Sequence, residues 1–164
     1  MSSLPAKTDL RDELARGLAA DLETRQRAYR AAREAATHEE AKPENDKDTR
    51  ALEQSYLARG EALRIEELTT ALVEVKAMSL RAFREGEAVT LGALVTTETT
   101  EGDGADTPLW LAPHGGGLRL ADGAVQVVTP RSPLGRAILG KKAGDECEVV
   151  IGGKTRALTI VLIR

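Results

Sequence analysis

The chain is expected to reverse its direction at the stretch Glu39-Glu40-Ala41-Lys42-Pro43-Glu44-Asn45-Asp46-Lys47-Asp48, which holds five acids in ten residues. Pro43 is the only proline between Pro5 and Pro108. A proline disfavours the helical conformation at the preceding residue, whereas its own φ suits a first helical turn. The sequence on both sides has helical character, so this stretch predicts a sharp turn between two long helices, with its acids at the end of a rod.

Both flanking segments carry apolar stripes at helical spacing, expected in helices over residues 8–38 and 43–79. The first stripe consists of Leu10, Leu14, Leu18, Leu22, Tyr29, Ala32 and Ala36. The second consists of Ala51, Ala58, Ile65, Leu68, Leu72 and Val75. From Ile65 onward the spacing alternates between three and four, which is typical of a coiled-coil seam.

An antiparallel helical hairpin is therefore predicted, because neither helix could bury its stripe alone. At about 1.5 Å per residue, a helix of roughly thirty residues is about 45 Å long. The stripes have more bulk away from the turn, and the small residues near the turn predict a close approach of the two helices there.

Glycine usage divides the chain near residue 85. Only Gly17 and Gly60 precede that position, and the other thirteen glycines follow it. The first part is rich in helix-forming residues, whereas the second has the Gly, Val and Thr content of short strands and turns. We therefore predict two domains, residues 1–84 and 85–164.

The second part reads as a mostly antiparallel sheet with one short helix, an α+β domain. A strand is expected over residues 88–95, followed by a polar loop over 96–108 and further strands over 109–111, 118–120 and 125–128. Ser132 is a helix N-cap with Pro133 in the first position, and Gly140 ends that helix. Segments 146–151 and 155–163 flank Gly152-Gly153 as a closing hairpin.

Composition excludes several classes of protein. A net charge of −3 argues against duplex nucleic acid as the main partner. The sequence has no apolar run of about 18 residues and its start lacks the features of a signal peptide, so a soluble cytoplasmic protein without a membrane partner is expected. Cys147 is the only cysteine, which excludes a disulfide framework, and its strand context predicts a small buried residue. His38 lacks a second ligand at metal spacing.

The run from Ser132-Pro133-Leu134-Gly135-Arg136 through Asp145, together with the final hairpin, closely resembles the C-terminal signature of the bacterial Gre-type (GreA/GreB) transcript cleavage factors. Members of that family join an N-terminal antiparallel coiled coil to a C-terminal domain of FKBP-like fold. The resemblance implies that the C-terminal domain docks on bacterial RNA polymerase at the secondary channel. Ser132, Pro133, Leu134 and Arg136 are the candidate docking residues.

The resemblance extends to the turn, where Pro43-Glu44-Asn45 is similar to the family's Ser-Glu-Asn. In the family, acids at this tip help the polymerase to hold a Mg²⁺ ion, so that it hydrolyses its own backtracked RNA. Two-metal hydrolysis needs a second Mg²⁺, and Mg²⁺ prefers carboxylate oxygens. Glu44 is therefore the candidate ligand. Ala41 stands where the family has an aspartate, and Glu40 and Asp46 are candidate substitutes for it.

The resemblance also implies a basic patch that contacts the 3′ end of the nascent RNA within the polymerase, and Arg27, Arg30 and Arg33 are its candidates. With Arg25 these arginines spread over about 200° of the helix, which favours a solvated surface instead. The expected protein is a monomer that is not itself an enzyme.

Three functions compete. The first is a Gre-type factor that stimulates transcript cleavage, and the second is a Gre-like regulator or inhibitor that occupies the same channel without cleavage; Ala41 favours the second. The third is a peptidyl-prolyl isomerase or chaperone. That activity needs an aromatic-lined pocket for proline, and Trp110 is the only aromatic residue after Phe83.

Overall fold

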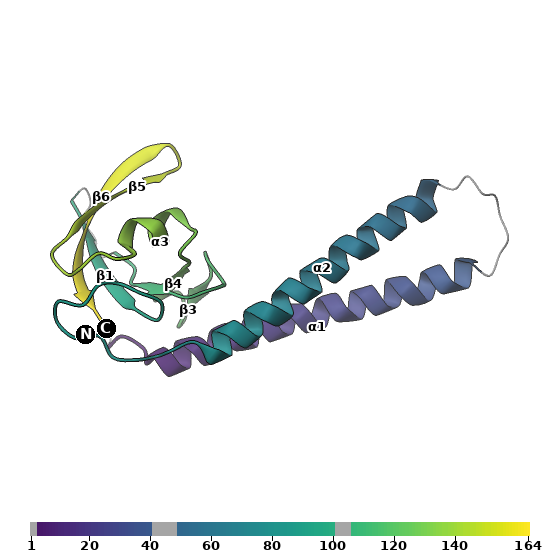
Figure 1. Cartoon of the computed structure of the whole chain (residues 1–164), viewed down its shortest axis with the longest axis horizontal. Helices are drawn as coiled ribbons and strands as arrows, with labels where there is room; N and C mark the ends of the chain where they lie inside the picture. Colours follow the sequence, from purple (N-terminus) through teal and green to yellow (C-terminus); the bar gives the residue numbers. More distant parts are fainter. Residues whose placement is uncertain (1–2, 41–48, 101–105) are drawn as a thin grey trace. The chain divides into compact units, whose positions relative to one another are not determined.

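A computed structural model describes residues 3–40, 49–100 and 106–164. The elements in chain order are α1 (Lys7–Glu40), α2 (Thr49–Ala77), β1 (Leu94–Thr99), β2 (Leu109–Leu111), β3 (Arg119–Leu120), β4 (Val125–Val128), α3 (Pro133–Ile138), β5 (Glu146–Ile151) and β6 (Lys154–Ile163) (Figure 1). The predicted class, two long helices followed by a sheet with one short helix, is confirmed. Contacts divide the chain into two compact units: Arg16–Val73, and Met1–Ala15 together with Glu74–Arg164. The domain boundary expected near residue 85 stays a prediction.

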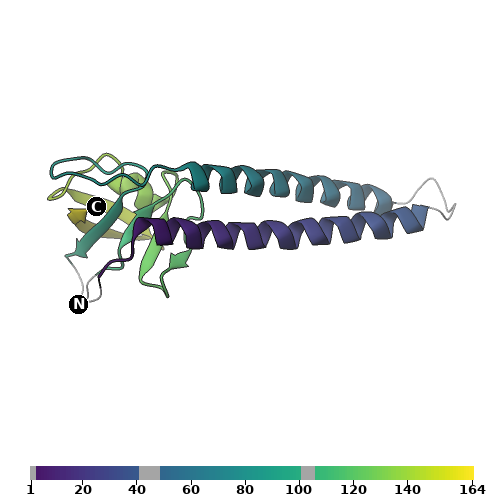
Figure 2. The same ribbon diagram turned by 90° about the horizontal axis from the view of Figure 1, so that it is seen from below.

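Within the unit Arg16–Val73, α1 and α2 form an antiparallel helical pair (Figures 1 and 2). Leu18 is 8% exposed and Leu68 is 4% exposed, which places both on the predicted seam. Ile65 and Leu72 are half-buried. An ion pair also joins the helices, because the Arg25 guanidinium contacts the Glu61 carboxylate at 3.0 Å.

The predicted close approach of the helices near the turn is wrong for the described residues. Ala32 and Ala51 are exposed, and so are Leu52 and Leu57. Figure 1 shows the two helices separating toward that end. The physical reason is that a buried methyl group removes little apolar area from water, so the alanines contribute too little to hold the helices together.

The second unit contains a six-stranded sheet in the order β3-β4-β2-β1-β6-β5. The sheet is mixed rather than antiparallel throughout, because β2 pairs in parallel with β4 through Leu109↔Gln126, Trp110↔Val127 and Leu111↔Val128. The closing hairpin is confirmed: β5 and β6 pair antiparallel across Gly152 and Gly153, whose φ angles of 59° and 77° suit a two-residue turn.

The strand predicted over residues 88–95 begins later than expected. β1 covers Leu94–Thr99 and therefore takes in part of the predicted polar loop. Gly92 turns the chain just before it, with a φ of +88° and the carbonyl oxygen of Ser79 where a side chain would stand. The Thr97 hydroxyl donates to the Asp106 carboxylate at 3.2 Å, and Thr99 also bonds that carboxylate. Antiparallel pairing with β6 holds this polar, threonine-rich segment in the sheet, and the two side-chain bonds tie it to Asp106.

One face of the sheet packs on α3, with Ile138 fully buried. The core cluster consists of Val89, Ala93, Val95, Leu109, Leu111, Val128, Ile138, Cys147 and Ile160. Cys147 is 4% exposed, which confirms the prediction that it is buried, and burial raises the pKa of its thiol. The start of α1 belongs to the same unit: Leu14 packs against Gly115, and the Glu13 carboxylate accepts from the Ala121 amide at 2.9 Å.

Candidate functional site

The Ser132 side chain organises the start of α3. Its hydroxyl accepts from the Gly135 amide at 3.1 Å and donates to the Thr129 carbonyl at 2.8 Å. The Thr129 amide also approaches the Ser132 oxygen, at 3.2 Å. Pro133 occupies the first turn, where no amide donor is missed. The predicted N-cap is therefore confirmed, and Gly140 follows the helix with a φ of +79°.

Gly135 is required by a close backbone contact. A Cβ atom at this position would lie 1.8 Å from the Thr129 carbonyl oxygen and 2.6 Å from its carbon. Both partners in this contact are backbone, so neither can rotate away. The turn before α3 is thus fixed from both sides, by the Ser132 hydroxyl and by the absence of a side chain at residue 135.

The four candidate docking residues divide into two pairs. Ser132 is half-buried and engaged in the cap, while Leu134 is half-buried and packs against the core cluster. Pro133 and Arg136 are exposed. The first pair therefore positions the helix, and the second pair is available to a partner.

Basic residues near α3 were missed by the sequence reasoning. Arg131 precedes the helix, Lys141 and Lys142 follow it, and all three are exposed. The helix α3 has six residues and is about 9 Å long. Together with Arg136, these basic residues place positive charge before, within and after it. The signal was visible in the sequence as four basic residues within twelve positions. Such a surface favours an acidic partner.

The tip candidates cannot be placed. Ala41, Glu44 and Asp46 lie outside the described residues, and Glu40 is the last residue of α1, described only as part of that helix. Among the residues that the structure does describe, no group of three or more His, Cys, Asp or Glu side chains could hold a metal ion.

The candidate RNA-contacting arginines lie on α1 and make local contacts. Arg27 is exposed and lies 4.0 Å from the Glu23 carboxylate. The Arg30 guanidinium donates to the Gln26 carbonyl at 3.3 Å, and that of Arg33 lies 5.9 Å from the centre of the Tyr29 ring. These contacts agree with a solvated helix surface, although they leave the charges accessible.

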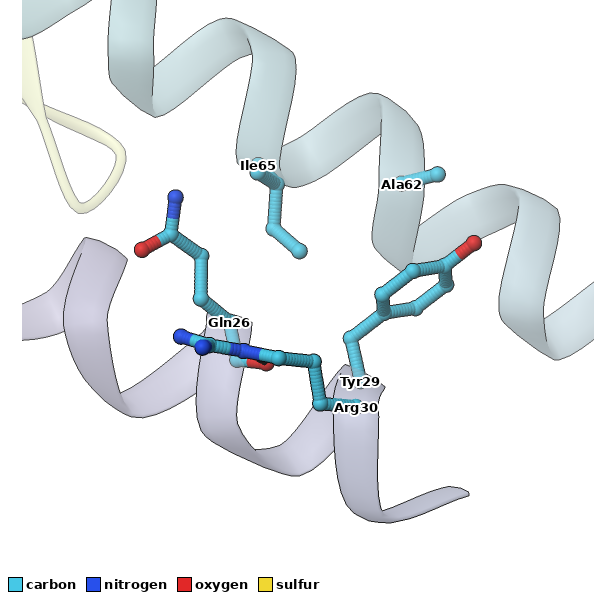
Figure 3. Close-up of a pocket in the computed structure, with 5 residues that line it drawn as sticks. All are labelled: Gln26, Tyr29, Arg30, Ala62 and Ile65. Atoms are coloured by element: carbon cyan, nitrogen blue, oxygen red, sulfur yellow. Dashed lines mark hydrogen bonds between the residues drawn. The ribbon is translucent and has the colours of Figure 1, made fainter. Parts of the chain in front are cut away.

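A shallow pocket lies between the helices of the hairpin (Figure 3). Its lining consists of Gln26, Tyr29 and Arg30 from α1 with Ala62 and Ile65 from α2. Figure 3 shows Ile65 pointing toward α1, with the Tyr29 ring standing between the helices beside Ala62. The pocket marks where the seam loosens: Tyr29 and Ile65 are half-buried, whereas Leu68 is buried. It contains one charged side chain, Arg30, and no cluster of groups suited to catalysis.

Comparison with protein families identifies the C-terminal half. Residues 84–164 match the family model described as "Transcription elongation factor, GreA/GreB, C-term". The chain belongs to the Gre-type transcription factors. The matched residues include the capped helix α3, the close contact at Gly135 and the closing hairpin β5–β6 of this chain.

Solved structures similar to this Gre-type chain include two Gfh1 proteins. One is described as GreA factor homolog 1 (Gfh1) of Thermus thermophilus, with 20% identity, 92% of this chain and 94% of that chain covered, and a TM-score of 0.40. The other is Gfh1 of Thermus aquaticus, with 22% identity, coverage of 91% and 92%, and a TM-score of 0.40. No curated protein gives a significant match to the sequence. In the described parts of the chain, no helix has the length and apolar character to span a membrane.

Proposed function

We propose that this Gre-type factor docks on bacterial RNA polymerase and extends its helical hairpin through the secondary channel to the catalytic centre. There it stimulates the polymerase to cleave backtracked RNA near its 3′ end. The observation that carries the proposal is the GreA/GreB family match over residues 84–164. The factor acts as a monomer in the cytoplasm, and the polymerase rather than this chain performs the hydrolysis.

Docking is assigned to the surface of α3. The cap at Ser132 and the packing of Leu134 hold the helix in place, so that Pro133 and Arg136 are presented to solvent at low conformational cost. An arginine is suited to pair with a carboxylate of the partner in a two-pronged geometry. The exposed charges of Arg131 and Lys141 support recognition of an acidic surface.

We assign to the tip of the hairpin the role of helping the polymerase to hold a Mg²⁺ ion. Glu44 and Asp46 lie in the sequence between Glu40, where α1 ends, and Thr49, where α2 begins. Carboxylate oxygens are the ligands that Mg²⁺ prefers, and a bound Mg²⁺ would stabilise the charge that develops on phosphate oxygens. Glu44 would hold the ion together with the polymerase, and Glu40 or Asp46 would supply the second carboxylate. In this arrangement, Arg27, Arg30 and Arg33 lie along α1 as candidates for contact with RNA.

A second candidate function is favoured by Ala41, which replaces the acid that the Gre family carries three residues before Glu44. With one carboxylate fewer, the factor would occupy the channel without raising the occupancy of the second metal. It would then regulate or inhibit the polymerase. An isomerase activity has no such support, because Trp110 is fully buried and cannot line a pocket open to a proline substrate.

A cleavage assay on a stalled, backtracked polymerase complex distinguishes these functions. Wild type should stimulate cleavage, and Glu44→Ala should abolish the stimulation while still binding the polymerase. Glu66→Ala is the matched control, because it removes an exposed acid from α2 outside the tip. Equal cleavage by wild type and Glu44→Ala would refute the role of Glu44. If wild type is silent and Ala41→Asp is active, the regulator is the correct function.

A further inference from the structure

The outer face of α2 carries an apolar stripe that no described part of the chain covers. Leu52, Tyr56 and Leu63 are 58%, 65% and 55% exposed. At 100° per residue they fall, together with Arg59, within an arc of about 60°. The buried seam residue Leu68 lies about 150° away from the centre of that arc. The stripe is therefore separate from the surface that pairs with α1.

The spacing of the stripe reads the same in both directions. Its residues are separated by four, three and four positions, in the order Leu52, Tyr56, Arg59, Leu63. This is the alternation of a coiled-coil seam. When two such stripes run antiparallel about a two-fold axis, Leu52 of one chain faces Leu63 of the other, and Tyr56 faces Arg59.

We infer that this stripe, hereafter the outer stripe, is a contact surface for a second copy of this chain, paired antiparallel through α2. Each layer of the pairing is chemically matched. The two leucine layers bury apolar surface, and each Arg59 guanidinium lies over a Tyr56 ring of the other chain, a favourable cation–π pair. The contact is isologous, as expected for a dimer with two-fold symmetry.

Arg59 is the reason to prefer a second copy over an unrelated apolar partner. It is exposed and makes no ion pair or hydrogen bond with the described residues. A charge in the middle of an apolar seam is costly against a purely apolar surface. In the antiparallel dimer the same charge meets the face of an aromatic ring, which the outer stripe supplies at the matching position.

The flanks of the outer stripe allow a close approach. Gly60 lies about 70° to one side of the stripe and Ser55 about 70° to the other. A Cβ atom at Gly60 would meet nothing within 4 Å, so packing within the chain does not require a glycine there. A glycine in the interior of a helix costs about 1 kcal/mol relative to alanine. A partner helix that approaches closely gives this residue a role.

The contact is short, which sets its strength. Glu66 and Thr70 occupy the next positions of the same seam, so the outer stripe ends at Leu63 after about 16 Å of helix. Three apolar side chains per chain form a small interface compared with those of stable dimers. Association should therefore be weak and dependent on concentration. This inference does not depend on the proposed function. At low protein concentration the dimer dissociates into the monomer that is proposed to act on the polymerase.

Sedimentation analysis of the full-length chain over a wide concentration range tests the pairing. The mean mass of wild type should rise toward twice that of the monomer, and Leu63→Glu should weaken association by about tenfold or more. Leu57→Glu is the matched control, because Leu57 is 74% exposed but lies about 130° from the stripe. A wild-type mass that is constant with concentration, or equal effects of the two variants, would overturn the inference.

Exchanging Tyr56 and Arg59 tests the register of the antiparallel pairing. It also distinguishes a lost contact from a variant that fails to fold. Tyr56→Arg places two arginines opposite each other and should abolish association. Combining it with Arg59→Tyr restores one arginine opposite one tyrosine in every layer, so the double variant should associate again. A double variant that stays monomeric while its helix content matches that of wild type would overturn this register.

Disulfide trapping distinguishes antiparallel from parallel pairing. In a Cys147→Ser background, an oxidised mixture of Leu52→Cys and Leu63→Cys chains should give the mixed disulfide, whereas either chain alone should give far less. Self-crosslinking of each single variant would indicate a parallel pair and would contradict the inference. If the stripe variants leave the mass unchanged but weaken binding to RNA polymerase, the face contacts the polymerase and the second-copy assignment is wrong.

Discussion

Gly135 shows how a single residue fixes the geometry of the helix start on which the proposed docking depends. Its missing side chain leaves room for the Thr129 carbonyl, and the Ser132 hydroxyl ties the same carbonyl to the start of α3. The sequence revealed the Ser132 cap and the helix, because capping follows local rules. It did not reveal the contact at Gly135, since that contact depends on how the turn folds back on itself.

A pair of glycine substitutions tests this account. Gly135→Ala should destabilise the chain by about 3 kcal/mol or more, because a methyl group would overlap a backbone carbonyl that cannot move alone. Gly17→Ala should instead stabilise it by about 0.5–1 kcal/mol, since Gly17 lies within α1 with open space around its Cα. Urea denaturation of both variants gives these differences. A neutral Gly135→Ala would contradict the close contact.

Glu87 gives a prediction of pH dependence. Its carboxylate accepts from the Arg84 amide at 2.7 Å and from the Arg81 guanidinium at 2.8 Å. The backbone hydrogen bond first, and then the bond from Arg81, lower the pKa of Glu87 below its ordinary value of 4.5. The stabilisation is therefore complete above about pH 4.5 and is lost as the pH falls through the lower pKa of the folded state.

The measurement is the free energy of unfolding of wild type minus that of Glu87→Gln, followed from neutral pH downward. Wild type should be the more stable protein at neutral pH, and the difference should shrink as the pH falls below about 4.5 and be lost below the pKa of the folded state. A difference that is constant or grows toward acid pH would show that the two hydrogen bonds do not hold the carboxylate in its charged form.

Among the elements, the helical hairpin is the part that the sequence predicted best in outline and least well in detail. The apolar stripes predicted the two helices α1 and α2 and the position of the seam between them. Leu18 and Leu68 on that seam are buried as expected. The close approach of the two helices near the turn was predicted only from the small size of the residues there, and it is wrong for the described residues. Alanine permits close packing but does not drive it, so Ala32 and Ala51 remain exposed.

Hydrogen exchange should therefore be graded along the hairpin. Backbone amides around Leu18 and Leu68 should exchange slowly, whereas those near Ala32 and Leu52 should exchange faster, because little apolar packing opposes local opening there. Exchange followed by mass spectrometry on peptides from α1 and α2 measures the gradient. Uniform protection along both helices would contradict the loosened packing.

In the sheet, the sequence located most strands but misplaced β1 and missed one parallel pair. The apolar content of residues 88–95 predicted a strand there, whereas Gly92 turns the chain and the strand begins at Leu94. The parallel pairing of β2 with β4 joins strands that are neighbours in the sheet but not consecutive in the chain, because β3 lies between them in the sequence. Local patterns carry no information about such pairing, because it is decided by the packing of the whole domain.

For the whole molecule, the central claim is that the Gre-type chain binds RNA polymerase through the surface of α3. Binding to core RNA polymerase, measured by titration at fixed salt concentration, tests it most directly. Arg136→Glu should weaken binding about tenfold or more, because it reverses a charge presented to the partner. Arg156→Glu, the same change at an exposed residue of β6, should bind as wild type does, and so should Glu44→Ala. Absence of binding by wild type, or wild-type affinity in Arg136→Glu, would contradict the account.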